Sequence, residues 1–489
     1  MPSYDERANG TRMVVESRRK HAIHELADRL APERDEWIER NRFYHEEDER
    51  FLRFLVGPHR RVLDLGCGTG HLLAALNPSR GVGVDFSTAM IEEARLRHPH
   101  LEFHVGDIED PAVLQALDGP FDVILLADTV GSIEDCQRTL NNLHSLCHRE
   151  TRVLIAYYSR LWGPLLHAAM RVGQQMPQTE LNWLSAQDLA GIMTLADFEV
   201  VRLDSRQIVP KRVGGLGGFA NRFVGTLPGI RSLALRNYVV ARPGRESRLG
   251  QRSATVVIPC RNEAGNIAPA IDRLPRFCDD IEVIFVEGHS RDNTATEVQR
   301  VIEKHPELDI KLVRQDGKGK ADAVRKGFDA ARGDILMILD ADLTTPPEDL
   351  PKFYEAITQG KGELIMGSRL VYPMEQEAMR TLNILGNKVF SLLFSWLLNQ
   401  RITDTLCGTK VISRSHYDKI KQGRGYFGEF DPFGDFDLIF GAAKLNLEIV
   451  EIPVRYRART YGSTQISRFR HGWLLLRMVI VAWRKLKAV

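Results

Sequence analysis

At 489 residues the chain is too long for one ordinary domain, and we expect two or three. Its 66 basic and 64 acidic residues nearly balance, and its 43% hydrophobic content is normal for a soluble protein whose halves each bury a core. The six cysteines are scattered without a Cys-x-x-Cys pair, which argues against a structural zinc site or a disulfide framework and fits a reducing cytosol.

The sequence predicts neither a signal peptide nor a transmembrane helix. The first residues, MPSYDERANG, lack an apolar stretch. No uninterrupted apolar run approaches the roughly 20 residues needed to cross a bilayer. We therefore expect a cytoplasmic protein that is soluble or sits on a membrane surface.

Two α/β domains in series are expected. Residues 1–58 are heavily charged and space four apolar residues at helical intervals, which predicts a helical cap: Ile38, Phe43, Phe51 and Phe54. From 59 to 243, runs such as VLDL, GVGVD, LEFHV, FDVILL and RVLIAYY alternate with helical patterns, as in an open, mostly parallel sheet. Residues 244–252 are polar and are interpreted as a linker. A second alternation covers 253–455, and 456–489 form a separate basic end.

A glycine-rich turn follows the first expected strand. Residues 62–70 read VLDLGCGTG and precede the helical run HLLAALN. Without Cβ atoms, such a turn lets the backbone approach a ligand at a helix N-terminus. The next strand ends in Asp85, fifteen residues past Gly70, where a carboxylate can accept both ribose hydroxyls. A third strand ends in Asp107, which we expect near an adenine.

The spacing Gly-x-Gly-x-Gly after an aspartate favours S-adenosylmethionine over a dinucleotide, and residues 60–160 resemble class I methyltransferases. The resemblance implies a Rossmann-like sheet and a cofactor site made of Asp64, Gly66, Gly68, Gly70, Asp85 and Asp107. Methyl transfer from a sulfonium depends on positioning more than on a strong base, so we expect no catalytic dyad. The cap residues His21, His24, Tyr44 and His45 are interpreted as core or surface residues, with substrate contact as the alternative.

Two carboxylates, Asp340 and Asp342, end a buried apolar run in DILMILDADLTT. Side chains two residues apart at a strand end project to the same side, where their repulsion calls for a cation. Two hard carboxylate oxygens suit Mg²⁺ or Mn²⁺. We expect Asp342 to be the main metal ligand and Asp340 to help hold the metal.

Residues 252–475 resemble family 2 GT-A glycosyltransferases, in particular the dolichol-phosphate mannosyltransferases. The opening VVIPCRNEAGNI matches the family's first strand and turn. The resemblance implies that the nucleotide of a UDP- or GDP-sugar is held by Pro259, Asn262, Glu263 and Glu287.

The second nucleotide motif departs from the family pattern. Glu287 in VEGHSRDNT keeps the first acid, but Gly288 and His289 replace the residues after it, which leaves the base open. In DGKGKADAVRK, Lys320 is expected to pair with the diphosphate.

The resemblance also implies an acceptor phosphate. Arg369 in GSRL is expected to contact it, and Asp437 in GDFDLIF to lie beside the reaction centre. Five residues are expected to bind the acceptor: Arg369, Arg380, Lys410, Arg459 and Thr464. A phosphate nucleophile is already ionised, so Asp437 need not act as a base, whereas a sugar hydroxyl would call for one. Thr344 and Gln465 stand where this branch often has a metal-binding Gln and a Lys.

The C-terminal end is basic and amphipathic. Residues 455–489 hold no Asp or Glu, and Trp473 and Trp483 lie among Arg and Lys on a helical pattern, which suits a membrane interface. The apolar stretch 389–399 is expected beside it. Both stretches alternatively form core or a dimer face.

The leading hypothesis is a bifunctional enzyme. It transfers a sugar with inversion from a nucleotide-sugar to a polyprenyl phosphate, and it methylates a related glycan or lipid-linked intermediate. One alternative extends a cell-surface glycan at a sugar hydroxyl, and another keeps the first domain as a non-catalytic S-adenosylmethionine-binding module. No nucleic-acid partner is expected, since no basic face or Asn/Asp-Pro-Pro-Tyr-like motif stands near Asp128. The sugar, the base, the methyl acceptor and the oligomeric state stay open.

Overall fold

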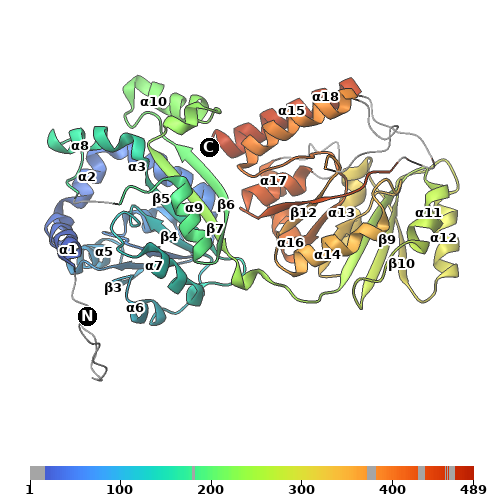
Figure 1. Ribbon diagram of the computed structural model, residues 1–489, viewed down its shortest axis with the longest axis horizontal. Coiled ribbons are helices and arrows are strands. Elements are labelled where there is room, and N and C mark those ends of the chain that lie inside the picture. The colour runs from blue at the N-terminus through green and yellow to red at the C-terminus, as the bar shows by residue number, and fades with distance from the viewer. Residues whose placement is uncertain are drawn as a thin grey trace, which may run out of the picture.

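The computed structural model describes residues 17–178, 182–371, 381–427, 436–457, 459, 461 and 468–489. Figure 1 shows two α/β halves side by side, with the N-terminal half in blue to green and the C-terminal half in yellow to red.

The N-terminal half is built on one sheet. Its strands are β1 (Arg61–Leu65), β2 (Arg80–Asp85), β3 (Glu102–Val105), β4 (Val123–Ala127), β5 (Arg152–Tyr158), β6 (Phe198–Arg206) and β7 (Arg236–Pro243). Within the described residues these seven strands take the order β3-β2-β1-β4-β5-β7-β6. Strands β1 to β5 are parallel, and β7 runs antiparallel between β5 and β6. Because the parallel strands all end at one edge, the turns after β1, β2, β3 and β4 meet there.

The helices of this half surround that sheet. They are α1 (Arg18–Leu30), α2 (Arg34–Arg40), α3 (Arg42–Val56), α4 (His71–Leu76), α5 (Thr88–Arg97), α6 (Pro111–Gln115), α7 (Cys136–Asn142), α8 (Gly163–Arg171), α9 (Ala186–Leu195) and α10 (Leu216–Phe219). Local caps fix several starts: the Ser87 hydroxyl accepts the Met90 N–H at 3.1 Å, and Ser185 and Asp188 form a capping box. Helices α1–α3 are the expected cap, and Phe51 and Phe54 are buried.

The C-terminal half repeats the layered plan with different pairing. Its strands are β8 (Ala254–Cys260), β9 (Ile281–Glu287), β10 (Asp309–Arg314), β11 (Ile335–Ile338), β12 (Leu364–Ser368), β13 (Lys410–Ser413) and β14 (Ile449–Pro453). In the described part of the chain, these seven strands take the order β10-β9-β8-β11-β13-β12-β14. Strand β13 is antiparallel to both of its neighbours, β11 and β12, whereas β14 is parallel to β12. The two mixed α/β sheets confirm the predicted fold class.

The helices of the C-terminal half are α11 (Ala264–Asp272), α12 (Thr294–Lys304), α13 (Lys320–Ala330), α14 (Leu350–Thr358), α15 (Thr381–Leu398), α16 (Arg414–Gly423), α17 (Phe436–Lys444) and α18 (Arg468–Ala482). Helices α15 and α18 lie together along one edge of this half (Figure 1). A search of the described helices finds none that is both long and apolar enough to span a bilayer.

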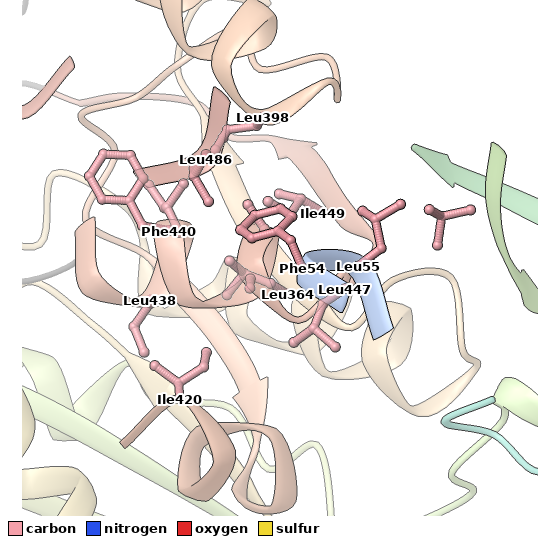
Figure 2. Packing of buried hydrophobic residues seen from close by; sticks show 14 of the residues in the cluster. Phe54, Leu55, Leu364, Leu398, Ile420, Leu438, Phe440, Leu447, Ile449 and Leu486 are labelled. Carbon is pink, nitrogen blue, oxygen red and sulfur yellow. The ribbon is translucent and has the colours of Figure 1, made fainter. Parts of the chain in front are cut away.

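The two halves share an apolar core. Phe54 and Leu55, from α3 of the N-terminal half, lie among Leu364, Leu447 and Ile449 of the C-terminal half (Figure 2). All five side chains are at most 7% exposed. The connection 244–252 is also packed, because a Cβ added at Gly360 would stand 2.7 Å from the Ser247 carbonyl.

Buried charges cross the same boundary. The Arg152 guanidinium donates to both Glu363 carboxylate oxygens at 2.8 and 2.7 Å and to the Asn446 carbonyl at 2.8 Å. Asn446 in turn donates to the Leu55 carbonyl at 3.1 Å. Burial would raise the pKa of Glu363, but Arg152 and other nearby cations lower it to about 2. We call this boundary of apolar and charged contacts the seam.

Candidate active sites

The turn after β1 is tightly enclosed. Gly66 and Gly68 have φ angles of +81° and +54°, a backbone conformation that strains other residues. A Cβ at Gly66 would stand 2.4 Å from the Thr129 hydroxyl oxygen, and that hydroxyl donates to the Leu65 carbonyl at 2.7 Å. A Cβ at Gly68 would stand 2.7 Å from Nε of Arg34 in the cap. Residues from β4 and from the cap therefore close around the predicted cofactor turn.

Asp85, at the end of β2, links the glycine turn after β1 to strand β2 by a hydrogen bond. One carboxylate oxygen accepts the Gly68 N–H at 2.8 Å, and the other accepts the Ser87 N–H at 3.0 Å. Burial raises the pKa of Asp85, while the two backbone donors act against it. Each oxygen keeps a second acceptor site, so a ribose hydroxyl can still bind.

Asp64, one strand away, is fully buried. Burial and the neighbouring Asp85 charge raise its pKa to about 7, and Arg34 partly offsets them. Asp64 is not among the residues that line the adjoining cavity, although the sequence predicts it at the methionine end of the cofactor.

Asp107 lies beyond β3 and meets the cap directly. It forms an ion pair with Lys20 of α1, which also donates to Glu109 at 2.7 Å. One Asp107 oxygen accepts the Glu109 N–H at 3.0 Å. Lys20 and Arg34 were not selected from the sequence, because their contacts join the cap to loops tens of residues away.

These groups border a cavity of about 400 Å³. Its lining includes Gly66, Gly68, Asp85 and Asp107 from the strand-end turns, together with five aromatic residues: Trp37, Tyr44, Tyr158, Trp162 and Trp183. The glycine cradle, the buried carboxylate and the adjoining volume fit S-adenosylmethionine with room beside it for an acceptor.

His45, which also lines this cavity, stands out chemically. Within the described residues, its ring nitrogens have no hydrogen-bond partner, and burial lowers its pKa to about 4. Its imidazole is therefore neutral at pH 7 and can accept a hydrogen bond.

The nucleotide turn of the second half follows β8. Asn262 has φ +57°; its N–H donates to the Ser290 hydroxyl at 3.0 Å, and its side-chain oxygen accepts the Arg291 N–H at 2.8 Å. The buried Glu287 ends β9 and accepts the Ser290 N–H at 2.5 Å. The structure thus brings Asn262 and Glu287 to one loop cluster, next to half-buried Pro259.

Asp340 and Asp342 follow β11, and each is paired with a cation. Lys320, the first residue of α13, lies 2.5 Å from Asp340. Arg459 spans Asp342 at 2.6 Å and Glu263 at 3.1 Å. Burial alone would raise the pKa of Asp340, but Lys320, followed by Lys410 and Arg369, brings it below its ordinary value.

A glycine from a distant loop completes this cluster. A Cβ at Gly408 would stand 2.0 Å from an Asp340 carboxylate oxygen and 2.5 Å from the Lys320 ammonium. Only a residue without a side chain fits against the Asp340–Lys320 pair. Lys410, two residues further on, was predicted from the sequence, but this glycine was not.

Comparison with known proteins decides the two identities. Residues 16–203 match a methyltransferase domain model, and residues 255–421 match the glycosyl transferase family 2 model. The chain joins a methyltransferase domain to a family 2 glycosyltransferase domain.

Relatives of the glycosyltransferase domain act on sugars. The chain is 28% identical to a low-salt glycan biosynthesis hexosyltransferase of Haloferax volcanii over 46% of this chain and 53% of that protein. It is 36% identical to a dolichol-phosphate mannosyltransferase of Pyrococcus furiosus over 24% of this chain and 33% of that protein. The matches thus span about half or less of these two relatives.

A solved methyltransferase structure is similar to the first half. It is a SAM-dependent methyltransferase from Thermotoga maritima, 18% identical, with a TM-score of 0.35, covering 45% of this chain and 99% of that protein.

The remaining predicted residues of the glycosyltransferase domain are held by partners of their own. Arg369 is buried and donates to Asp404 at 2.6 and 2.8 Å, and its guanidinium lies 5.1 Å from the Tyr456 ring centre. Lys410 is fully buried and donates to the Cys407 carbonyl at 2.6 Å. Arg380 and Thr464 lie outside the described residues.

Asp437, at the start of α17, is held by two arginines. One of its oxygens accepts from Arg325 of α13 at 3.1 Å and from Arg424 at 3.2 Å. Arg325 therefore joins α13 to α17.

The two carboxylates after β11, Asp340 and Asp342, supply some of the ligands that a divalent cation needs. In the described residues no three His, Cys, Asp or Glu side chains gather as a metal site. The two carboxylates offer hard oxygen ligands at one strand end, as Mg²⁺ and Mn²⁺ prefer, and the remaining ligands would come from a diphosphate and water.

Proposed function

We propose that the chain is a bifunctional enzyme. Its glycosyltransferase domain transfers a sugar, with inversion and with Mg²⁺ or Mn²⁺, from a UDP- or GDP-sugar to a polyprenyl phosphate. Its methyltransferase domain uses S-adenosylmethionine to methylate a related glycan or lipid-linked intermediate. Two observations support the proposed glycosyl transfer. The carboxylate pair Asp340–Asp342 lies beside Lys320, and one relative is named for dolichol phosphate.

On the donor side, the nucleotide lies against Pro259, Asn262, Glu263 and Glu287. Lys320 faces the diphosphate from the start of α13, where the helix N-terminus also favours anions. Asp342 and Asp340 hold the cation, which when bound stabilises charge on the leaving diphosphate. The Arg459 guanidinium lies 2.6 Å from one oxygen of Asp342 and therefore competes with the cation for this carboxylate.

On the acceptor side, a phosphate oxygen attacks the sugar carbon. It is already ionised, so the domain needs to orient it by cations: Arg369, Arg380, Lys410 and Arg459, with Thr464. The contacts of Asp437 with Arg325 and Arg424 support a role in fixing α17 rather than in taking a proton.

In the methyltransferase domain, S-adenosylmethionine lies on Asp64, Gly66, Gly68, Gly70, Asp85 and Asp107, and when bound it supplies the methyl group. The acceptor lies in the remaining volume against the tryptophans. His45 lines this volume, and its neutral ring can accept a hydrogen bond that orients a hydroxyl or amine acceptor.

We place the protein at the cytoplasmic face of a membrane, held peripherally by the C-terminal helix. Trp473 is 68% exposed on α18, and Arg484 and Lys485 follow in the sequence. Such a helix favours an anionic interface.

The first experiment measures nucleoside diphosphate release with Mn²⁺ or Mg²⁺ across UDP- and GDP-sugars, with and without polyprenyl phosphate. Release that needs one donor and the lipid, and that is lost in Asp342→Ala but kept in the exposed-residue control Asp279→Ala, supports the lipid-linked sugar synthase. Donor turnover indifferent to the lipid would exclude that acceptor and favour a glycan hydroxyl.

The methyltransferase proposal has its own test. S-adenosylmethionine should raise the melting temperature of the wild type and of His45→Ala alike, while only the wild type transfers methyl groups to extracted lipid-linked glycans. The absence of a melting shift would overturn S-adenosylmethionine binding. A shift without methylation of any glycan fraction favours the non-catalytic binding module.

A further inference from the structure

Exposed apolar side chains gather in four segments: residues 160–178, 208–233, 381–400 and 468–489. Of the 19 large hydrophobic side chains that are exposed in the described residues, 13 lie in these segments, which make up 87 of the 489 residues. In the methyltransferase domain they include Leu165, Leu216 and Phe219, which are 60%, 69% and 58% exposed. In the glycosyltransferase domain Leu392 and Trp473 are 73% and 68% exposed.

The charged residues of these four segments are all Lys or Arg. Together they contain 13 Lys and Arg and no Asp or Glu, although the chain has 64 acidic residues. Exposed cations include Arg171, Lys211, Arg212, Arg477 and Arg484. Apolar side chains interspersed with cations, with acidic residues excluded, are typical of a surface that meets anionic lipid.

The four segments are continuous in space. The Trp162 indole N–H donates to the Leu233 carbonyl at 2.9 Å, which joins the first two segments. The Trp396 indole N–H donates to the Thr226 carbonyl at 2.9 Å, which joins the second segment to α15.

The fourth segment joins the same group. The rings of Phe223 and Trp483 lie 5.7 Å apart, and α18 packs on α15. In Figure 1, helices α8, α10, α15 and α18 lie along one edge of the molecule, across both halves. We call this surface, made of the four segments, the basic-apolar face.

The methyltransferase cavity reaches this face. Its lining includes Trp162, Leu165, Leu166 and Ala169 on or next to α8, and Lys211 in the second segment. Leu165 both lines the cavity and is 60% exposed. One wall of the cavity is therefore also part of the basic-apolar face.

We propose that the basic-apolar face binds an anionic lipid bilayer through both domains together. This docking sets the mouth of the methyltransferase cavity at the bilayer surface, so its methyl acceptor is a lipid-linked molecule that enters over α8. The inference rests on the proposed function, which places the C-terminal helix at a membrane. It extends this membrane contact to the methyltransferase domain and names the class of methyl acceptor.

Vesicle flotation of the full-length protein tests this contact. We compare phosphatidylcholine vesicles with vesicles containing 30% phosphatidylglycerol, and expect binding only to the latter, weakened about tenfold at high salt because charge attraction is screened. The double variants Leu216→Asp/Phe219→Asp and Trp473→Asp/Ile480→Asp should each weaken binding about tenfold or more, because each loses buried apolar area and gains repulsion. The matched control Leu96→Asp/Leu195→Asp changes residues that are 77% and 67% exposed outside the four segments, and should bind like the wild type.

The outcomes separate the inference from the proposed function. Loss of binding in Trp473→Asp/Ile480→Asp but not in Leu216→Asp/Phe219→Asp overturns the inference and leaves C-terminal membrane contact standing. Absence of binding to either vesicle overturns both. The protein could instead form a dimer in solution that both double variants disrupt, and bind no vesicles. The basic-apolar face would then be a dimer interface, and the inference would be overturned.

Fluorescence quenching by brominated lipids tests the position of the cavity mouth. Bromine in the acyl chains quenches only tryptophans at the bilayer. We expect Trp162→Phe and Trp473→Phe each to reduce the fluorescence intensity that bromine removes, and Trp37→Phe, on α2 of the cap, to leave that lost intensity unchanged. Quenching unaffected by Trp162→Phe would overturn the entry of the acceptor over α8.

Discussion

The two candidate sites are built in different ways. The methyltransferase site is a cavity of about 400 Å³, lined by the strand-end turns, the cap and α8. The glycosyltransferase site is a cluster of charged side chains, in which Asp340 and Asp342 pair with Lys320 and Arg459. A cavity suits a transfer that depends on positioning, whereas paired charges suit a leaving group that carries negative charge. The two sites nevertheless stand on one body, because the seam joins their domains.

Breaking the seam should give the largest effect. In Arg152→Leu, buried Glu363 loses its two short hydrogen bonds from the guanidinium. It keeps the Glu448 N–H at 2.9 Å and longer contacts with His416 at 3.6 Å and Arg242 at 3.8 Å. We expect a loss of about 3–5 kcal/mol in the free energy of unfolding, since a buried charge loses its partner. Urea denaturation measures this, and the double variant Arg152→Leu/Glu363→Leu should recover much of the loss.

The matched control is Arg245→Leu. Its ion pair with Asp197 is about half exposed, so the expected loss is below about 1 kcal/mol. Equal losses in Arg152→Leu and Arg245→Leu would show that the buried Arg152–Glu363 contact adds no more stability than an exposed ion pair, and the apolar contacts alone would then join the two domains.

The seam also predicts a pH dependence. Burial raises the pKa of Glu448 to about 7, from an ordinary value of 4.5. The folded chain therefore holds a proton that the unfolded chain releases, and this contribution, present below pH 4.5, is lost as pH rises through 7. Glu448→Gln removes the titration, so its stability relative to wild type should rise by up to about 3 kcal/mol between pH 5 and pH 8. Urea denaturation of both proteins at the two pH values measures it, and a constant difference would contradict the assignment.

A change confined to the glycosyltransferase site should separate the two sites. The Cβ of Gly408→Ala displaces Asp340 or Lys320, which it would meet at 2.0 and 2.5 Å. We expect the rate of nucleoside diphosphate release to fall about 100-fold, because a shift of about 1 Å in a reacting group lowers a catalysed rate by about that factor. S-adenosylmethionine binding should be unchanged. Gly423→Ala, whose Cβ would meet nothing within 4 Å, is the control, and equal turnover in both variants would remove Gly408 from the site.

Much of each site was predictable because strand ends meet at one edge of a parallel sheet. Asp85 and Asp107 border one cavity, and Asp340 and Asp342 follow β11, as their places after apolar runs indicated. The two-sheet fold and the order of the domains were predicted and are confirmed.

The enclosing residues were not predictable in this way. Arg34 reaches Gly68 from another helix, and Gly408 meets Asp340 from a loop 68 positions away. Such contacts follow from how elements pack, and no local period or spacing encodes them. The basic-apolar face is an intermediate case: its lack of acidic residues is visible in the sequence, but the adjacency of residues 208–233 to α15 appears only in three dimensions.

The smallest expected effect concerns the methyltransferase turn. In Gly66→Ala the new Cβ meets the Thr129 hydroxyl at 2.4 Å, at a φ of +81° that strains alanine. Thr129 can rotate only by giving up its hydrogen bond to Leu65, and the strain costs of order 1–3 kcal/mol. We expect S-adenosylmethionine affinity, measured by calorimetry, to fall about tenfold, while Gly191→Ala on α9, with nothing within 4 Å of its Cβ, keeps it. An unchanged affinity in Gly66→Ala would mean that the cofactor does not contact this turn. If nucleoside diphosphate release also fell, the effect would have passed through the seam, and the two sites would be coupled as well as joined.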